Sequence, residues 1–367
     1  MSRRLVIGTA LLGCAAIMFA LSSAHDDART ALPQRARLGT EGSVDAVSAL
    51  LGTRERISDI DLVYQCPSVA AGSAKGVLLL LHGCSHAATD FWPASQSCNE
   101  CISLPIETAI VAASLARGWA TLSVSSVDRA SKCWHPARDA PRLAKAVRHA
   151  RAACGLATEA SPVAAIGASS GGHMASLLDM SDIDSIIGVV AQIMPSGAEL
   201  SPAHLPVRFV HMLRDSRSAQ LIREQVSELA AAGVDADEWQ VHPTPLTVES
   251  FGARGHQTSG IAALPPDTAQ AAIAALTAAG LLDARGELVS DPRRSDWRSV
   301  LRPVIPASQH DSLVADASAV SEVLNVAWAM HEFTDAYIDE SLDWFEERLK
   351  AHQAGSPHAR TPKAELV

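Results

Sequence analysis

The chain is poor in aromatic residues and has no excess of positive charge. Phenylalanine, tryptophan and tyrosine together make up 4% of its 367 residues, so an aromatic-lined surface for polymeric carbohydrate is not expected. Lysine and arginine number 30 against 40 aspartate and glutamate residues, which gives a formal net charge of −10. Because no basic stripe interleaved with aromatic residues is present, nucleic acid is excluded as a partner.

The sequence also lacks internal repeats and a common zinc-binding motif. No stretch recurs at a fixed period, which excludes a solenoid. The pair His331-Glu332 has no second histidine that would complete an H-E-x-x-H motif. We therefore expect no metal and no other cofactor. With 48% hydrophobic and 19% charged residues, the composition is that of an ordinary globular protein.

The N-terminal 24 residues have the pattern of a signal peptide. Arg3 and Arg4 precede an apolar run over residues 5–21, and small residues follow up to Ala24. Cleavage after Ala24 would make the protein secreted, or resident in a periplasmic or endomembrane lumen. About 17 apolar residues also suffice to span a bilayer, so an uncleaved membrane anchor is the alternative. Beyond this segment we expect no contact with a membrane.

Six of the seven cysteines lie outside the signal segment, which contains Cys14. An even number of cysteines in an exported chain predicts up to three disulfides, and six cysteines allow about 15 pairings. A zinc site is the less favoured alternative, because an oxidising compartment disfavours thiolate ligands; its ligands would be Cys98, Cys101, Cys133 and His135.

The most informative stretch is residues 167–172, Gly-Ala-Ser-Ser-Gly-Gly. It follows a short apolar run and precedes a helical pattern, so it predicts a sharp turn between a strand and a helix. Small residues on both sides of Ser169 allow the strained backbone of such a turn. The positive end of the following helix would face an oxygen that becomes negative during acyl transfer. The pattern therefore indicates a nucleophilic serine.

The apolar run at residues 77–81 predicts a buried parallel strand. It ends at His82-Gly83-Cys84-Ser85, where glycine lets the backbone approach a ligand. In a serine hydrolase this turn supplies one backbone N–H of the oxyanion hole, from Cys84 or its neighbour Ser85. The residue after the nucleophile, Ser170, supplies the other.

Strands alternate with helices along most of the chain. Two elements frame the pattern, a strand at 57–64 and a closing helix at 334–350. Between them we expect further strands at 119–125, 162–166, 183–193, 207–213 and 238–242, and helices at 106–117, 141–153, 219–232, 268–279 and 321–330. This order predicts a mainly parallel central sheet with helices on both faces.

The remaining segments define the domain organisation. Residues 25–52 have no periodicity and are expected to form a flexible lead-in to a domain at 53–350. Within that domain, residues 249–306 depart from the alternating pattern and are expected to form a helical insert, or cap. Residues 351–367 form a polar tail.

Two residue types must accompany a nucleophilic serine. Asp215 follows the strand at 207–213 and could hold an imidazole, although Asp is also a common helix N-cap. Asp128 is an alternative acid that precedes the serine in the chain. His331, directly before the closing helix, is our preferred base, and His256 and His310 are the alternatives.

These motifs in this order resemble the α/β-hydrolase superfamily over roughly residues 62–350. The segments at 81–84 (Leu-His-Gly-Cys) and 167–172 are similar to those of exported esterases grouped with polyhydroxyalkanoate depolymerases and feruloyl esterases. The Cys133-Trp134 pair and the segment at 331–334 (His-Glu-Phe-Thr) look closer to an uncharacterised group of eukaryotic α/β-hydrolases.

The resemblance implies an α/β-hydrolase fold with the helical insert placed before the catalytic histidine. It implies Ser169 as nucleophile, Asp215 as acid and His331 as base. The expected function is an exported carboxylic ester hydrolase acting on a small-molecule or oligomeric ester. A serine peptidase, an acyltransferase and a non-catalytic binding protein are the alternatives.

Overall fold

The computed structural model describes residues 50–70, 72–156, 160–252, 263–315 and 318–354. The predicted signal peptide at 1–24, most of the lead-in at 25–52 and most of the tail at 351–367 lie outside these residues. None of the described helices is both long enough and apolar enough to cross a membrane.

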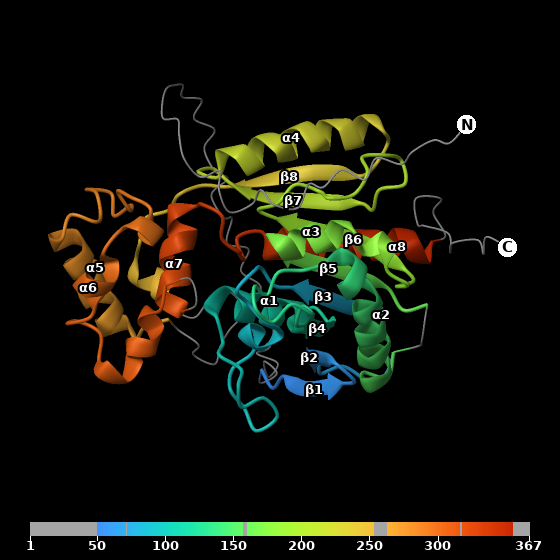
Figure 1. The fold of residues 1–367 in the computed structure, drawn as a ribbon, viewed down its shortest axis with the longest axis horizontal. Coiled ribbons are helices and arrows are strands. Elements are labelled where there is room, and N and C mark those ends of the chain that lie inside the picture. Colours follow the sequence, from blue (N-terminus) through green and yellow to red (C-terminus); the bar gives the residue numbers. More distant parts are fainter. Residues whose placement is uncertain (1–49, 71, 157–159, 253–262, 316–317, 355–367) are drawn as a thin grey trace, which may run out of the picture. The chain divides into compact units, whose positions relative to one another are not determined.

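Eight strands form one sheet in the order β1-β2-β4-β3-β5-β6-β7-β8 (Figure 1). Only the pairings β1–β2 and β2–β4 are antiparallel, and all the others are parallel. The strands are β1 (Thr53–Ile57), β2 (Ile60–Gln65), β3 (Val77–Leu81), β4 (Ala120–Val124), β5 (Val163–Ala168), β6 (Ile186–Gln192), β7 (Val207–Met212) and β8 (Ala236–Val241).

The single strand expected at 57–64 is wrong, because two strands and a tight turn occupy this region. β1 and β2 form a hairpin whose two-residue loop is Ser58-Asp59, with Ser58 at φ 57°. The sequence of β1, Thr-Arg-Glu-Arg-Ile, lies at the sheet edge and buries little. It therefore lacks the apolar alternation by which a strand is recognised.

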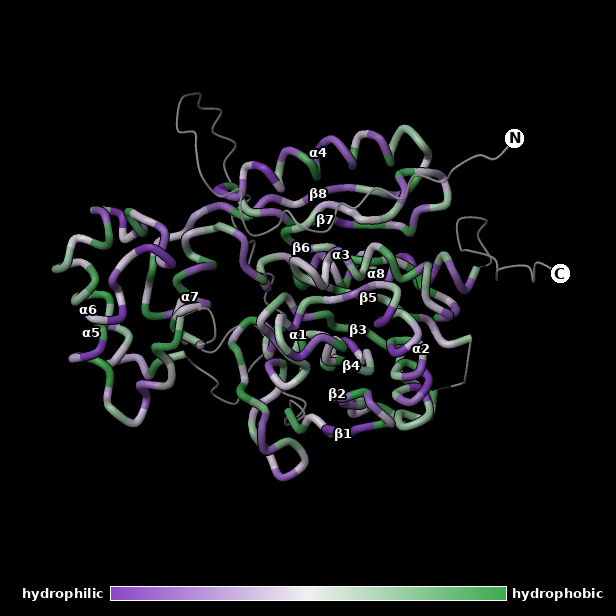
Figure 2. Tube along the Cα trace, in the orientation of Figure 1, coloured by the Kyte–Doolittle hydropathy of each residue, from purple (hydrophilic) through white to green (hydrophobic). Residues whose placement is uncertain are grey.

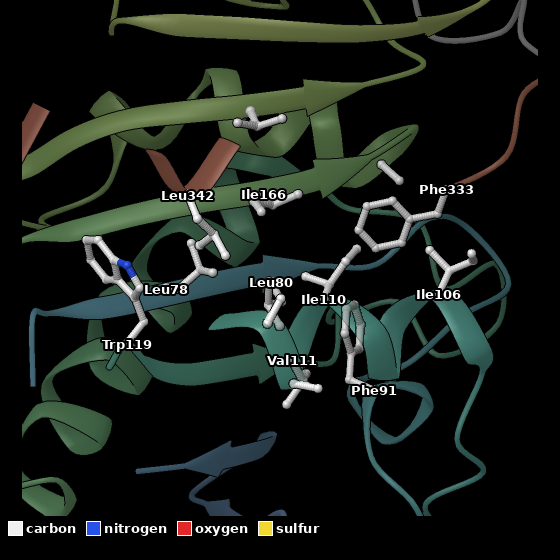
Figure 3. Close-up of a cluster of buried hydrophobic side chains, with 14 of the residues drawn as sticks. Leu78, Leu80, Phe91, Ile106, Ile110, Val111, Trp119, Ile166, Phe333 and Leu342 are labelled. Atoms are coloured by element: carbon white, nitrogen blue, oxygen red, sulfur yellow. The ribbon is translucent and has the colours of Figure 1, made fainter. Parts of the chain in front are cut away.

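Helices cover both faces of the sheet (Figure 1). Alternate residues of a strand point to opposite faces, so Leu78 and Leu80 belong to one cluster with side chains of α1 and α8, and Leu79 and Leu81 belong to another with side chains of α2, α3 and α4. Figure 3 shows Leu80 near Ile110 of α1. These helices are α1 (Pro105–Ala116), α2 (Pro136–Ala153), α3 (Ser170–Ser176), α4 (Ser216–Ala231) and α8 (Ile338–Gln353).

The surface helix α4 shows how the sequence pattern directs this packing. Hydrophobic and hydrophilic residues alternate along it (Figure 2), and its buried residues Ala219, Ile222 and Leu229 lie at helical spacing. The start of α2 is less regular. This helix begins at Pro136, and it was expected only from Pro141, which the helix accommodates in its second turn.

A third hydrophobic cluster lies between β8 and α8 in the chain. Its buried side chains run from Leu246 to Ala327 and so include residues of the next helix, whereas the helical insert was expected over residues 249–306. The elements of this insert are η3 (Val248–Phe251), α5 (Pro266–Ala278), η4 (Pro292–Arg294), α6 (Trp297–Leu301), η5 (Ala307–Leu313) and α7 (Ala319–Trp328). Two further short 3-10 helices are η1 (Ala88–Phe91) and η2 (Leu178–Met180).

The six cysteines form three disulfides, Cys66–Cys154, Cys84–Cys133 and Cys98–Cys101. Cys98, Cys101 and Cys133, the three thiol ligands of the alternative zinc site, are all in these disulfides, so they cannot bind zinc. Among the described residues, no cluster of histidine, cysteine, aspartate and glutamate could hold a metal ion.

Candidate active site

Ser169 occupies the turn between β5 and α3. Its backbone lies at φ 53° and ψ −118°, a conformation that residues other than glycine rarely adopt. The turn is held from both sides, because Ser169 N–H donates to Gln192 O at 3.0 Å and Ser169 O accepts from His173 N–H at 2.9 Å. A strained residue fixed in this way is typical of a functional position.

The glycines of the motif are required by close backbone contacts. A Cβ at Gly171 would lie 2.2 Å from Leu81 O, and a Cβ at Gly167 would lie 2.2 Å from Gly171 O. The parallel pairing of β3 with β5 places Leu81 opposite Gly167. The end of β3 therefore lies directly beside the turn that carries Ser169, which brings the Gly83-Cys84 segment to the same site.

Three polar side chains from distant parts of the chain meet at this turn. Ser169 Oγ lies 3.0 Å from His331 Nε2, and His331 Nδ1 lies 2.8 Å from Asp215 Oδ2. With Nδ1–H donating to the carboxylate, Nε2 is left to accept the hydroxyl proton. This is the geometry in which an imidazole can deprotonate a serine.

Asp215 follows β7 and is mostly buried, with 12% of its side chain exposed. Burial acts to raise the pKa of Asp215, but its hydrogen bonds with His331 and Ser218 outweigh burial and hold the pKa below its usual value. The carboxylate also caps α4 by accepting from Ser218 N–H. The Asp215 side chain therefore makes both contacts that were expected as alternatives: it bonds the imidazole of His331 and it caps α4.

The alternative residues have other surroundings. Asp128 accepts hydrogen bonds from Ser131 and from backbone N–H groups of its own loop, and the bond from Ser131 lowers its pKa to about 2. His310 Nε2 contacts Ile305 O at 3.0 Å. His256 lies outside the described residues. The structure thus brings together Ser169, Asp215 and His331.

His331 lies on a loop that two other segments hold in place. Helix α7 ends at Trp328, and both Ala329 and His331 have positive φ values, 54° and 46°. The backbone N–H of Arg214, next to Asp215, donates to Ala329 O at 3.1 Å, and the Arg214 guanidinium stacks on the Trp328 ring. The loop of the acid and the loop of the histidine are therefore joined directly.

Arg293, in the insert, forms the second connection to this loop. Its guanidinium donates to Met330 O at 2.9 Å, to His331 O at 3.1 Å and to Glu332 Oε2 at 3.0 Å. Arg293 was not among the predicted site residues, since a lone arginine in a polar stretch is usually a solvated side chain.

The two expected oxyanion donors lie on opposite sides of Ser169 in the chain. Among the described residues, no acceptor is bonded to the N–H of Cys84 or of Ser170, whereas Ser85 N–H donates to Ser131 O at 3.0 Å. The Ser85 alternative is therefore already occupied. The Cys84–Cys133 disulfide fixes this segment to the loop that contains Ser131.

The buried ring of His82 holds the Gly83-Cys84 segment in place. Its Nδ1 donates to Gly83 O at 2.7 Å, and its Nε2 accepts from Ser126 N–H at 3.2 Å. Complete burial lowers the pKa of His82 to about 4, so the ring is neutral and can accept at Nε2.

A cavity of 230 Å³ opens beside Ser169. One part of its wall is apolar and includes Ala168, Ile193 and Phe333. The rest is polar or charged and includes His86, Glu107, Arg293 and Glu332. Glu107 was not among the predicted site residues, although it is the single charged residue in the otherwise uncharged helix α1.

No protein-family model and no curated protein matches this chain. Among solved structures, it is similar to the esterase Est2 of the planctomycete Thermogutta terrifontis, with 13% identity, 54% of this chain and 83% of that chain covered and a TM-score of 0.38. It is also similar to MGS-M1, an α/β hydrolase enzyme from a deep-sea metagenome library of the Medee basin, with 12% identity, 82% and 99% covered and a TM-score of 0.41.

These similarities are too distant to assign an activity. Two features of this chain's own structure identify its fold: the order of the eight strands and the strand–turn–helix unit around Ser169. The mainly parallel sheet, its helices on both faces and the strained serine turn after β5 give this chain the α/β-hydrolase fold.

Proposed function

We propose that this chain is an exported serine hydrolase that cleaves carboxylic esters through an acyl-enzyme. The observation that carries the proposal is the series of contacts Ser169 Oγ to His331 Nε2 at 3.0 Å and His331 Nδ1 to Asp215 Oδ2 at 2.8 Å. It is supported by the positive φ of Ser169 and by the open cavity beside it.

In the first half of the proposed reaction, Ser169 Oγ attacks the ester carbonyl carbon while His331 Nε2 takes its proton. The N–H groups of Cys84 and Ser170 stabilise the negative charge that develops on the carbonyl oxygen. His331 then gives the proton to the departing alkoxide, so that the alcohol leaves and the acyl group stays on Ser169.

In the second half, water attacks the acyl carbon and His331 takes the proton of that water. Collapse of the intermediate breaks the bond to Ser169 Oγ, which recovers its proton from His331 as the carboxylic acid leaves. Asp215 stays ionised throughout and stabilises the imidazolium, in agreement with its lowered pKa.

The proposal of export is supported by the three disulfides together with the signal-like sequence at 1–24. Structural disulfides persist in oxidising compartments and are rare in the cytosol. The same serine mechanism would serve a peptidase or an acyltransferase, and no observation favours either over ester hydrolysis.

Hydrolysis of aryl esters of increasing acyl length tests the proposed function. We expect Ser169→Ala to lower kcat by about 10⁴-fold or more, because the variant retains only the oxyanion donors and substrate binding. Far-ultraviolet circular dichroism and thermal unfolding would check that the variant stays folded. Turnover by folded Ser169→Ala at the wild-type rate would refute the proposal.

A further inference from the structure

His86 lines the cavity beside Ser169 with one ring nitrogen bonded and the other not. Its side chain is 20% exposed. Nδ1 lies 2.9 Å from Asp90 Oδ2, whereas Nε2 has no hydrogen-bond partner among the described residues and is not closed off from solvent. The protein therefore fixes one side of the ring and leaves the other side to a molecule in the cavity.

The ring of His86 lies close to the nucleophile. A Cβ at Gly83 would lie 3.8 Å from His86 Cδ2 and 3.8 Å from Ser169 Cβ, so this glycine alone lies between the two side chains there. Cδ2 is bonded to Nε2, whereas Nδ1 is turned toward Asp90. The backbone N–H of His86 also donates to Gly83 O at 3.4 Å, which holds the ring next to the expected oxyanion turn.

The surroundings of His86 make Nε2 a donor. The Asp90 carboxylate is fixed in place, because it is 8% exposed and also accepts from Ala87 N–H at 3.0 Å. Burial lowers the pKa of His86, but the hydrogen bond with Asp90 and the nearby carboxyl groups of Glu107 and Glu332 raise it to about 9. The ring is therefore protonated at neutral pH, and both of its nitrogens carry a hydrogen.

The second cation of the cavity wall is already engaged. The Arg293 guanidinium donates to two carbonyls and to Glu332 Oε2 on the loop of His331. The charge of His86 is balanced by Asp90, so this pair does not select for an anion. It offers a charge-assisted hydrogen bond, which is stronger than one from a neutral donor and which a neutral oxygen can accept.

We propose that His86 forms a subsite that donates its Nε2–H to an acceptor oxygen of the substrate, an ether or carbonyl oxygen near the reacting ester. The inference rests on the proposed ester hydrolysis at Ser169 and adds a preference among esters. An ester with such an oxygen in its acyl or alcohol part would be preferred over its methylene analogue, because the analogue leaves the charged N–H without a partner.

Two pairs of isosteric esters test the subsite on the wild-type protein. The acyl pair is 4-nitrophenyl 3-methoxypropanoate and 4-nitrophenyl pentanoate, and the alcohol pair is 2-methoxyethyl butanoate and butyl butanoate. Each kcat/KM is divided by the rate constant of hydrolysis by hydroxide, which removes the intrinsic effect of the ether oxygen. We expect the corrected value near neutral pH to be roughly tenfold higher for the ether in at least one pair, as a hydrogen bond to a charged group allows.

Two variants assign this preference to the His86 side chain. His86→Leu should abolish it. His242→Leu, a matched change at an exposed histidine outside the cavity wall, is the control and should prefer the ether as the wild type does.

A third variant, Asp90→Asn, tests the charge of the ring. Without the carboxylate the pKa of His86 falls, so the preference should be lost at a lower pH than in the wild type, which keeps it up to about pH 9. The other titratable groups around the ring are unchanged in this variant; they are His82, Glu107, Arg293 and Glu332. Ionisation of the triad cancels in the ratio of two esters, since both need it.

The outcomes separate the subsite from the proposed function. If the wild type hydrolyses the esters through Ser169 without preferring the ether in either pair, or if His86→Leu keeps the preference, the subsite is refuted and ester hydrolysis stands. The same pH dependence in Asp90→Asn as in the wild type would overturn the charged donor. If none of the esters is hydrolysed, both proposals fall. Because the wild-type comparison needs no variant, misfolding of His86→Leu would not protect the inference.

Discussion

The side chain of His86 is the clearest case of a residue whose charge depends on its neighbours. It is mostly buried beside the active site, 2.9 Å from Asp90. Burial alone would lower the pKa of His86, but the hydrogen bond with Asp90 and the nearby carboxylates raise it from 6.5 to about 9. The protonated ring therefore stabilises the folded chain at neutral pH.

This pKa predicts a pH dependence of stability. Since the pKa is higher in the folded chain, the contribution of His86 is fully present below about pH 6.5 and is lost as pH rises through about 9. We expect the free energy of unfolding, measured with urea between these pH values, to fall in the wild type. Asp90→Asn should flatten this fall, and the same slope in both proteins would contradict the role of the pair.

At the residue scale, the sequence was most informative where chemistry requires a rare local pattern. A Cβ at Gly167 or Gly171 would lie 2.2 Å from a backbone oxygen, so the turn requires glycine at both positions. This requirement makes the motif recognisable in the sequence, and Ser169 could be identified without a structure. Asp215 and His331 were named from their places after a strand and before a helix, and the structure brings both to Ser169. Arg293 could not be named, because its role arises only from tertiary contacts.

Among the elements, the insert is linked most directly to the active site through Arg293 of η4. This side chain bonds two carbonyls and one carboxylate on the loop of His331. His331 has a positive φ, which costs free energy and needs support from its surroundings. The guanidinium supplies that support from outside the sheet.

We expect Arg293→Ala to lower kcat by roughly 10- to 100-fold with a smaller change in KM, because small displacements of a catalytic group have large effects. Free guanidinium should restore part of the lost turnover, which a merely destabilising change would not show. Arg298→Ala, on the exposed side of α6, is the matched control. A loss confined to KM would contradict a positioning role.

Elements that bury a continuous apolar face were predictable, and polar ones were not. The strand expected at 77–81 coincides with β3, in which every residue is buried. The hairpin of β1 and β2 was missed because the edge strand β1 is polar. The insert was expected at 249–306, and the third cluster also contains Val320, Val323 and Leu324 of α7. Apolar spacing alone does not show which cluster a helix joins, because that depends on tertiary packing.

At the scale of the whole molecule, the three disulfides close loops of very different length. The sequence separation is 88 residues for Cys66–Cys154 and 3 for Cys98–Cys101. Cross-linking a long loop removes more entropy from the unfolded chain, about 4–5 kcal/mol for the first pair against about 2 kcal/mol for the second. The sequence predicted that the cysteines pair but not which ones, since pairing depends on the fold.

We therefore expect the double variant Cys66→Ala/Cys154→Ala to lose clearly more stability than Cys98→Ala/Cys101→Ala. Urea unfolding under non-reducing conditions measures both, with thiol titration to verify that the remaining pairs are intact. Equal losses, or five to six free thiols in the unmodified protein, would contradict the disulfide framework and with it the proposal of export.

The central claim is that Ser169 is a nucleophile activated by His331, and labelling with a fluorophosphonate followed by peptide mapping tests it most directly. The account predicts a single modified residue, Ser169, in the wild type and no label in Ser169→Ala. Labelling should be slowed by orders of magnitude in His331→Ala and should proceed at the wild-type rate in His256→Ala. Absence of label from the folded wild type, or rapid labelling of His331→Ala with a silent His256→Ala, would contradict the account.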